Sequence, residues 1–490
     1  MANSSGMKHK GGIRYENVES DFLLKRQLHR KANWVLLWGL GVGAVISGDY
    51  FGWNFGLHAG GFLGLAIATV LMAAMYLCMI YSIAELTTAL PHAGGFYSFT
   101  RSAFGPWGGF IVGITDTIEY VLTPAVIVVG IGGYLNTLIP EVPLWLWWLV
   151  SYTLFVGINI RGVEITLKVG MFVTVISIVV LLVFYGSAIF SGAFKFDLLF
   201  STSESGEPTL MPNGWLGIFA ALPYAIWFYL AIEELPLAAE ETVDVVRDMP
   251  RAMIIGIFTL LALSFGTIVL NSGVGGGVDV IGVSGAPLND GFKAIFGDGM
   301  ATVVLTLIAL TGLIASFHTI IYAYGRVIFA LSRAGYFPRW ISVTSNRFKT
   351  PHRALIGGGV VGFVMAIILD LYGSGIVGAA LLNMAVFGAV ISYAVVMASF
   401  VKLRKSRPDL IRPYRSPLGV PGAYVGMILA IIALAACFSN TDYIPAVYGV
   451  ALFLVTGMVY FALYSRTRLV AKAPEEEVAL LAKAQEELKH

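Results

Sequence analysis

The chain has 490 residues and a net charge of +2; 57% of its residues are hydrophobic and only 12% are charged. Because about a quarter of the residues in a soluble domain are charged, this composition excludes a water-soluble fold, which could not bury so much apolar surface. The nearly neutral charge gives no support to a nucleic-acid partner. We therefore predict a protein that lies within a lipid bilayer.

The long apolar runs predict helices rather than barrel strands. In hydrocarbon every backbone N–H and C=O must find a partner within a helix or a closed sheet, and runs of about 20 residues are twice the length of a barrel strand. Cys78 and Cys437 lie inside such runs, so we expect them to pack there and to form no disulfide. We predict an all-α integral membrane protein with twelve transmembrane helices, near residues 34–57, 61–88, 106–138, 143–160, 166–191, 214–237, 252–271, 300–331, 354–371, 377–402, 422–438 and 444–465.

The basic residues gather on one side of this topology. With both termini on the same side, every Lys and Arg except Lys195 and Lys293 falls there. The positive-inside rule then places both termini in the cytoplasm, and the polar first 30 residues predict a cytoplasmic tail rather than a signal peptide. We expect a multi-pass protein of the cell membrane, which fits a bacterial inner membrane. The acidic segment from Glu475 to Glu487 predicts a solvated helix.

The predicted spans divide the chain into five segments. These are a cytoplasmic N-terminal tail at 1–33, a ten-helix core at 34–402, a basic cytoplasmic loop at 403–421, the last two helices at 422–465 and a cytoplasmic C-terminal tail at 466–490. We expect Glu85 to have a structural role at the cytoplasmic end of its span. A cytoplasmic salt-bridge latch is expected after the sixth span, among Glu240, Glu241, Asp244, Asp248, Arg247 and Arg251.

Two predicted spans are interrupted near their centres. The span at 34–57 contains repeated glycines and the polar trio Ser47-Gly48-Asp49, and the span at 214–237 contains Pro223. These two spans occupy matching positions if the first ten helices form two inverted repeats of five. Broken helices at matching positions indicate a binding site at the membrane midplane, although the glycines could instead serve close helix packing.

Four stretches of the chain resemble the amino acid, polyamine and organocation superfamily of transporters. They are Gly41–Gly48, Ala84–Tyr97, Ala238–Thr242 with Met249–Ala252, and Arg407–Tyr414. The resemblance covers the chain from about residue 30 to 465. It implies a leucine-transporter-like arrangement, in which a 5+5 inverted repeat is followed by two peripheral helices. It also implies transport by alternating access around a site between the broken helices.

Within that superfamily, four segments are most similar to the ethanolamine permease branch. They are Ser47–Trp53, Ile118–Ala125, Trp227–Glu233 and Ser316–Gly325. Asp49-Tyr50 replaces the apolar dipeptide that commoner amino acid carriers have after the serine-glycine pair. A fixed carboxylate there would repel the carboxylate of an amino acid and attract a cation. We therefore expect import of a small primary amine such as ethanolamine, with a permease for neutral or cationic amino acids as the alternative.

Carboxylates and aromatic rings beside the two breaks could hold an ammonium group. A buried ammonium needs a counter-charge and hydrogen-bond acceptors, and an aromatic face attracts it. Three of these residues could have structural roles instead: Asp49 could cap a helix, Glu119 could pair with a neighbouring span, and Trp227 could only pack in the core. The predicted substrate-binding residues are Ser47, Gly48, Asp49, Tyr50, Glu119, Trp227 and Tyr229.

Five further residues are candidates for ion coupling or gating. By the resemblance, Glu233 matches an acidic position shared across much of the superfamily, and Ser177 stands where proton-coupled relatives often have a lysine. His318 lies in an apolar span, where an ionisable group indicates function. The hydroxyls of Ser316 and Thr319 could coordinate sodium, or could bond to carbonyls of their own helix. We expect no cofactor beyond a coupling ion, and the residues favour neither proton nor sodium.

Two other classes of protein are remote alternatives. A channel would need repeated rings of pore-lining residues, and a sensor would lack turnover. An enzyme is not expected, because the chain contains no nucleophile elbow, zinc-binding helix motif, phosphate loop or Cys/His cluster. The expected partners are a small amine and the lipid bilayer, with no nucleic acid; the sequence leaves the oligomeric state open.

Overall fold

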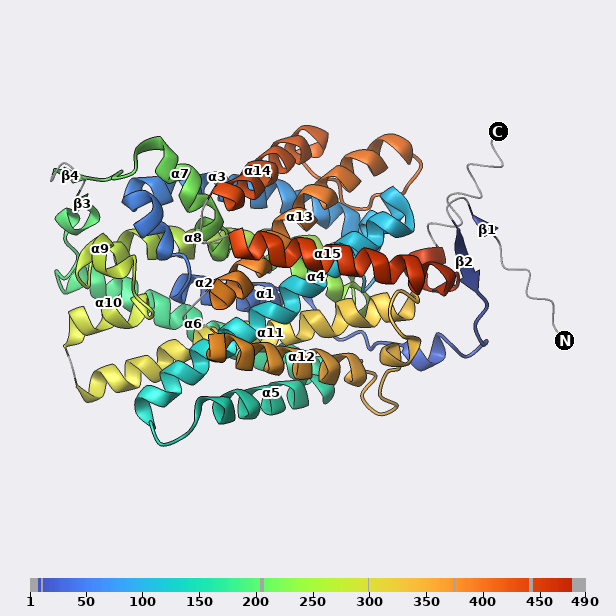
Figure 1. Cartoon of the computed structure of the whole chain (residues 1–490), viewed down its shortest axis with the longest axis horizontal. Helices are drawn as coiled ribbons and strands as arrows, with labels where there is room; N and C mark the ends of the chain where they lie inside the picture. Colours follow the sequence, from blue (N-terminus) through green and yellow to red (C-terminus); the bar gives the residue numbers. More distant parts are fainter. Residues whose placement is uncertain are drawn as a thin grey trace.

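The computed structural model describes residues 8–9, 12–202, 207–297, 299–372, 376–439 and 444–477. These residues form a bundle whose long helices run along the longest axis of the molecule (Figure 1). The main helices are α1 (Trp34–Val45), α3 (Phe55–Ala89), α4 (Gly95–Leu138), α5 (Leu144–Ile160), α6 (Val163–Phe190), α7 (Gly214–Ala225), α8 (Val245–Ser272), α11 (Met300–Arg333), α12 (His352–Tyr372), α13 (Ile376–Ser406), α14 (Gly419–Ser439) and α15 (Ile444–Leu463).

The helices have the length and composition of membrane spans. Within the described ranges, ten helical stretches are long and apolar enough to cross a bilayer, and two shorter apolar helices, Trp34–Tyr50 and Leu144–Ile160, accompany them. Large apolar side chains such as Phe172 and Leu452 point outward, with 67% and 69% of their surface exposed. Such a surface is stable against lipid tails and not against water. The all-helical membrane fold predicted from composition is confirmed.

Two glycines bend the long helices α3 and α4. Gly61 (φ 69°) and Gly105 (φ 78°) have a left-handed backbone that residues with a Cβ rarely adopt. A Cβ on Gly61 would also lie 2.3 Å from Cδ of Pro212. The first two predicted spans, 34–57 and 61–88, therefore meet at a kink inside α3 rather than at a loop.

Both predicted interruptions are present in the structure. The first break follows α1, where the short helix α2 (Ser47–Tyr50) ends at the extended residue Phe51. The second break follows α7, which continues into the 3₁₀ helix η3 (Ile226–Phe228). A second 3₁₀ helix, η4 (Ile232–Glu241), starts only after Ala231, whose φ of 83° is unusual for a residue with a side chain.

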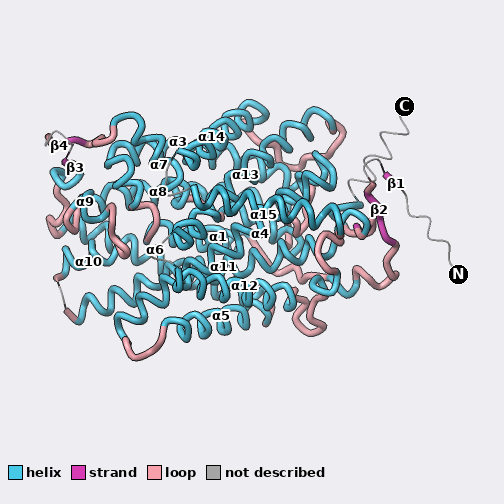
Figure 2. The backbone as a smooth tube through the Cα atoms, in the orientation of Figure 1, coloured by secondary structure: helices cyan, strands magenta, loops and turns pink. Residues whose placement is uncertain are grey.

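Short elements outside the spans were not predicted. Helices α9 (Gly277–Ile281) and α10 (Pro287–Phe296) precede α11, and β3 (Ser201–Thr202) pairs with β4 (Pro208–Thr209) at the same end of the bundle (Figure 2). At the other end, β2 (Ile13–Glu16) pairs antiparallel with β1 (Lys8–His9) and parallel with β5 (Leu469–Val470). The first and last described segments of the chain therefore lie side by side.

The beginning of the acidic C-terminal segment is buried, which corrects the prediction of a solvated helix there. Glu475 and Glu476 have no exposed surface. Arg333 donates to Glu475 at 2.5 Å, and Nε of Arg101 donates to both carboxylate oxygens of Glu476 at 2.8 Å. Sequence reasoning failed because the arginines that neutralise these carboxylates lie 142 and 375 residues away along the chain. The rest of the segment, from residue 478, lies outside the described residues.

The expected salt-bridge latch has different partners from those predicted. Glu240 pairs with Arg333 and Glu241 with Arg326, so both arginines come from α11. Of the two arginines expected in the latch, Arg251 lies over the ring of Trp34 at 3.9 Å instead. The latch thus joins the second broken helix to α11 rather than closing on its own segment.

Glu85 has the structural role expected of it. It lies near the end of α3, is buried, and accepts from Arg404 at 2.5 Å and from the backbone N–H of Ser416 at 2.8 Å. Arg412 also pairs with it at 3.1 Å. Glu85 therefore holds the basic loop between α13 and α14 against the bundle.

Candidate functional site

The two broken helices meet backbone to backbone. A Cβ added to Gly48 in α2 would lie 1.9 Å from the carbonyl oxygen of Trp227 in η3. Gly52 approaches the side chain of the same residue, and its added Cβ would lie 3.2 Å from the indole ring. Only glycine permits such an approach at Gly48. The predicted residues Gly48 and Trp227 are thus neighbours, and the indole is 7% exposed.

Helix α8 holds a carboxylate and a phenol beside this contact. Thr267 donates to Oδ1 of Asp49 at 2.9 Å, and the hydroxyls of Ser264 and Tyr229 are 2.9 Å apart. Ser264 and Thr267 are three residues apart and so share one face of α8. The predicted residues Asp49 and Tyr229 are therefore brought to one side of the breaks by two residues that sequence reasoning missed.

Asp49 is not a helix cap in this structure. Its hydrogen bond goes to a side chain of α8, and its second oxygen, Oδ2, has no partner among the described residues. Asn54, the residue before α3, makes no capping bond either; its side-chain oxygen accepts from the backbone N–H of Gly52 at 3.2 Å, outside the helix. Asp49 has no exposed surface, so its free oxygen faces the protein interior.

A second group of carboxylates lies between α4, η4 and α13. Glu119 and Glu233 are buried neighbours, 1% and 2% exposed, and both oxygens of Glu119 and Oε2 of Glu233 have no hydrogen-bond partner among the described residues. Oε1 of Glu233 accepts from the hydroxyl of Tyr393 and from the N–H of Ala231 at 3.1 Å, the residue at the break. Two carboxylates in contact cannot both be ionised without a cation. The pair can therefore hold either a shared proton or a cationic group.

A run of tyrosines connects the two groups. The ring of Tyr76 lies 5.3 Å from that of Tyr229 and 5.4 Å from that of Tyr393, and its hydroxyl donates to Tyr393 at 3.0 Å. Asp116, one turn before Glu119, accepts from Ser392 at 2.6 Å. The predicted residues Asp49, Tyr229, Glu119 and Glu233 thus belong to one buried polar region. The sequence indicates this region only through polar residues at helical spacing within apolar spans.

Ser47 and Tyr50 face a different set of helices. The hydroxyl of Ser316 in α11 accepts from the N–H of Ser47 at 3.0 Å and donates to the carbonyl of Gly43 at 2.9 Å, bridging the end of α1. The hydroxyl of Tyr50 donates to the carbonyl of Ser177 in α6 at 2.8 Å. These contacts therefore fix α2 against α11 and α6.

The other coupling candidates have their polar atoms occupied by protein. Nε2 of His318 bonds to the carbonyl of Thr166 at 2.9 Å, so that nitrogen carries the proton, and Nδ1 can accept from Asn159 at 3.3 Å. Thr319 donates to Ala315 of its own helix at 2.9 Å, and Ser177 donates to Val173 at 2.9 Å. Sodium coordination near Ser316 and Thr319 stays a prediction.

A closed bundle in which two broken helices meet beside buried carboxylates is the architecture of a secondary transporter. The profile of the amino acid permease family matches residues 33–463, and the chain belongs to that family. It is therefore a permease and not an enzyme.

Relatives support the same family. The chain is 31% identical to an uncharacterized transporter of Rhizobium meliloti over 329 residues, 65% of this chain and 69% of the relative. It is 24% identical to a branched-chain amino acid permease of Bacillus subtilis, over 87% of this chain and 91% of the relative. It is 23% identical to L-asparagine permease 1 of Mycobacterium tuberculosis, over 82% of this chain and 83% of the relative.

Proposed function

We propose that the chain moves an amino acid across the membrane by alternating access, with the substrate's ammonium group held beside the two breaks. The observation that supports this most directly is the contact of Gly48 with Trp227, because it places two interrupted backbones next to buried carboxylates. Exposed backbone groups at such breaks bind the charged ends of small solutes. Named relatives that carry branched-chain amino acids and asparagine support an amino acid as the substrate.

The carboxylate oxygens supply the counter-charge. Oδ2 of Asp49 has no partner among the described residues, and Glu119 and Glu233 form a pair that can accept a cation. An ammonium group between such oxygens makes charge-assisted hydrogen bonds, which are about twice as strong as neutral ones. Trp227, at the contact between the two breaks, adds an aromatic face.

A small amine without a carboxylate, such as ethanolamine, is the second candidate. The specific observation in its favour is the buried, half-unpaired carboxylate of Asp49 one residue from the contact between the breaks. A fixed negative charge there disfavours the α-carboxylate of an amino acid, whereas ethanolamine has no carboxylate to be repelled. The two candidates therefore differ in what Asp49 does.

Counterflow into proteoliposomes separates the candidates. We would load vesicles with unlabelled leucine, asparagine, lysine or ethanolamine and follow entry of the same labelled compound, for wild type, Asp49→Asn and the exposed control Asp197→Asn. The amino acid proposal expects saturable counterflow of at least one amino acid, with ethanolamine unable to compete. The amine proposal would replace the amino acid proposal if the wild type shows counterflow of ethanolamine but of no amino acid, and if Asp49→Asn abolishes that counterflow.

Saturation and trans-stimulation also test the transport mechanism. We expect internal substrate to accelerate entry of external substrate, as it does in an alternating-access carrier whose empty form returns more slowly than its loaded form. If uptake of every compound tested rises linearly with its concentration and does not change with internal substrate, the protein is not a carrier for these compounds.

A further inference from the structure

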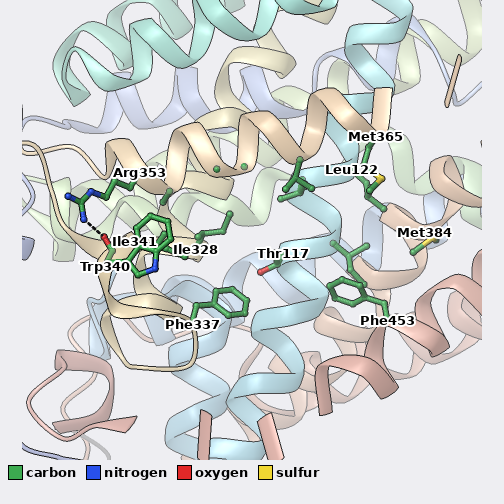
Figure 3. A pocket seen from close by; sticks show the side chains of 16 residues that line it. Thr117, Leu122, Ile328, Phe337, Trp340, Ile341, Arg353, Met365, Met384 and Phe453 are labelled. Atoms are coloured by element: carbon green, nitrogen blue, oxygen red, sulfur yellow. Dashed lines mark hydrogen bonds between the residues drawn. The ribbon is translucent and has the colours of Figure 1, made fainter. Parts of the chain in front are cut away.

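An apolar groove opens on the membrane-facing side of the bundle, away from the two breaks. It has a volume of about 450 Å³ and lies between α4, α11, α12, α13 and α15 (Figure 3). Its wall consists of Ile, Val, Leu, Met and Phe side chains together with the backbone of two glycines of α12, Gly357 and Gly358. The hydroxyl of Thr117 in that wall donates to the carbonyl of Gly113 in its own helix at 2.6 Å, so it leaves no unpaired donor in the groove.

One end of the groove is charged and aromatic. Among the described residues that line it, Arg353 is the charged one. Its Nη1 donates to the carbonyl of Trp340 at 2.9 Å, and the indole of Trp340 is 60% exposed (Figure 3). No carboxylate pairs with Arg353 in the described part of the chain, so its remaining donors are available. A Trp beside an Arg at the end of a membrane helix is typical of the lipid headgroup level.

The charged end faces the same side of the membrane as the chain's terminal segments. Trp340 belongs to the 3₁₀ helix η5 (Arg339–Ser342). The N–H of Thr344, two residues beyond η5, donates to the carbonyl of Lys25 in the N-terminal segment at 3.1 Å. By the positive-inside rule this side, which carries nearly all the basic residues, faces the cytoplasm, where anionic lipid is attracted to basic segments.

The groove has the depth of one lipid leaflet. Its lining along α12 runs from Arg353 to Met365, and at 1.5 Å per residue this stretch of helix is about 18 Å long. Half of a hydrocarbon core of about 30 Å is about 15 Å. A chain anchored at Arg353 would therefore end near Met365, Met384 and Phe453, at the far end of the groove in Figure 3.

We propose that this groove binds one acyl chain of an anionic phospholipid, whose phosphate pairs with Arg353. The apolar wall matches the chain, the free guanidinium donors match the phosphate, and the length matches one leaflet. A transmembrane helix of a partner protein could pack against the apolar wall of the groove, but it would leave Arg353 without a counter-charge. This site is independent of the substrate, so its test does not depend on the proposed function.

The test is native mass spectrometry of the full chain released from nanodiscs that contain equal amounts of phosphatidylglycerol and phosphatidylcholine. Two variants alter the groove: Arg353→Gln removes the charge, and Gly357→Leu fills the cavity, since a Cβ on Gly357 meets nothing within 4 Å. Each has a matched control outside the groove. Arg347→Gln removes an exposed charge from the loop that precedes α12, and Gly186→Leu adds the same side chain to α6, where a Cβ also meets open space.

We expect wild type and both controls to retain one phosphatidylglycerol molecule. Arg353→Gln should lose the preference for phosphatidylglycerol by about fivefold, the factor that one basic residue contributes near an anionic surface. Gly357→Leu should lose retention of both lipids. Equal retention of the two lipids by wild type, or unchanged retention in Gly357→Leu, would overturn the proposal, as would a second protein chain bound in place of lipid.

Discussion

A single missing side chain sets how closely the two broken helices approach. The contact between Gly48 and Trp227 involves a backbone carbonyl rather than the end of a flexible side chain, so nothing there can rotate out of the way. A methyl group is accommodated only if α2 and η3 separate. The residue with the most exacting position in the site is therefore one that carries no functional group.

We expect Gly48→Ala to lower counterflow by about tenfold or more, which corresponds to about 1.4 kcal/mol and lies within the usual cost of overpacking. The matched control is Gly133→Ala in α4, where an added Cβ meets nothing within 4 Å. Initial rates, normalised to protein in the vesicles, measure the effect. Normal transport by Gly48→Ala would mean that the breaks do not need this contact.

His92 gives the protein a defined response to acid at the end of the bundle. It lies in the turn between α3 and α4, and burial lowers the pKa of its imidazole from 6.5 to about 4, with Glu240 opposing the shift and Arg333 adding to it. Between pH 6.5 and 4 the unfolded chain binds a proton at this residue that the folded chain does not. The contribution of His92 to stability is therefore present at neutral pH and is lost as the pH falls through this range.

The expected outcome is a melting temperature that falls less steeply between pH 6.5 and 4.5 in His92→Gln than in wild type. Thermal unfolding in detergent, followed by tryptophan fluorescence at several pH values, measures the slope. Other groups also titrate in this range, so the quantity to compare is the difference between the two proteins. Parallel curves would show that His92 is not held neutral.

At the scale of elements, the C-terminal segment after α15 acts as part of the bundle. Glu476 accepts from Arg101 at the start of α4 and from the hydroxyls of Tyr336 at 2.8 Å and Tyr15 at 3.1 Å. Arg333 at the end of α11 joins Glu475 to Glu240 of the second broken helix. The segment thus links α4, α11 and η4 through buried charges at the end of the bundle where β2 and β5 pair.

We expect Glu476→Gln to destabilise the protein, because it leaves the buried guanidinium of Arg101 without a counter-charge. Breaking a buried ion pair in this way costs about 3–5 kcal/mol. The neighbouring substitution Glu477→Gln changes an exposed carboxylate and should have no effect. Thermal unfolding of both variants in the same detergent makes the comparison, and equal melting temperatures would show that Glu476 is dispensable.

Local sequence signals predicted the helices and their breaks, whereas hydrogen bonds and ion pairs between residues far apart in the sequence could not be predicted. Gly48, Asp49 and Pro223 mark the interruptions because they are unusual within an apolar span. Nothing near Thr267 indicates that its hydroxyl binds Asp49, since 218 residues separate them. The same holds for the tail carboxylates, whose exposure depends on arginines in other helices. Periodicity and composition determine spans, and only tertiary packing determines which polar groups meet.

At the scale of the whole molecule, the two ends of the bundle differ in charge and in structure. One end carries the terminal segments, the basic loops and the buried ion pairs; the other carries β3, β4, α9 and α10 (Figure 1). The orientation with both termini in the cytoplasm rests on this asymmetry and stays a prediction.

Single cysteines would test this orientation. The two natural cysteines, Cys78 and Cys437, are buried, and a membrane-impermeant maleimide should not reach them. We expect Asp197→Cys to be labelled in intact cells, and Glu477→Cys to be labelled only in inside-out vesicles. Labelling of Glu477→Cys in intact cells would reverse the topology.

The parallel pairing of β2 with β5 also has a consequence for how the protein is made. Residues 13–16 leave the ribosome before any of the membrane helices, but their partners at 469–470 follow α15. The small sheet and the ion pairs of Glu475 and Glu476 can therefore form only when every span has been synthesised. Closure of that side of the bundle must therefore follow synthesis of the helices, and a nascent chain that stalls before residue 469 keeps β2 paired with β1 alone.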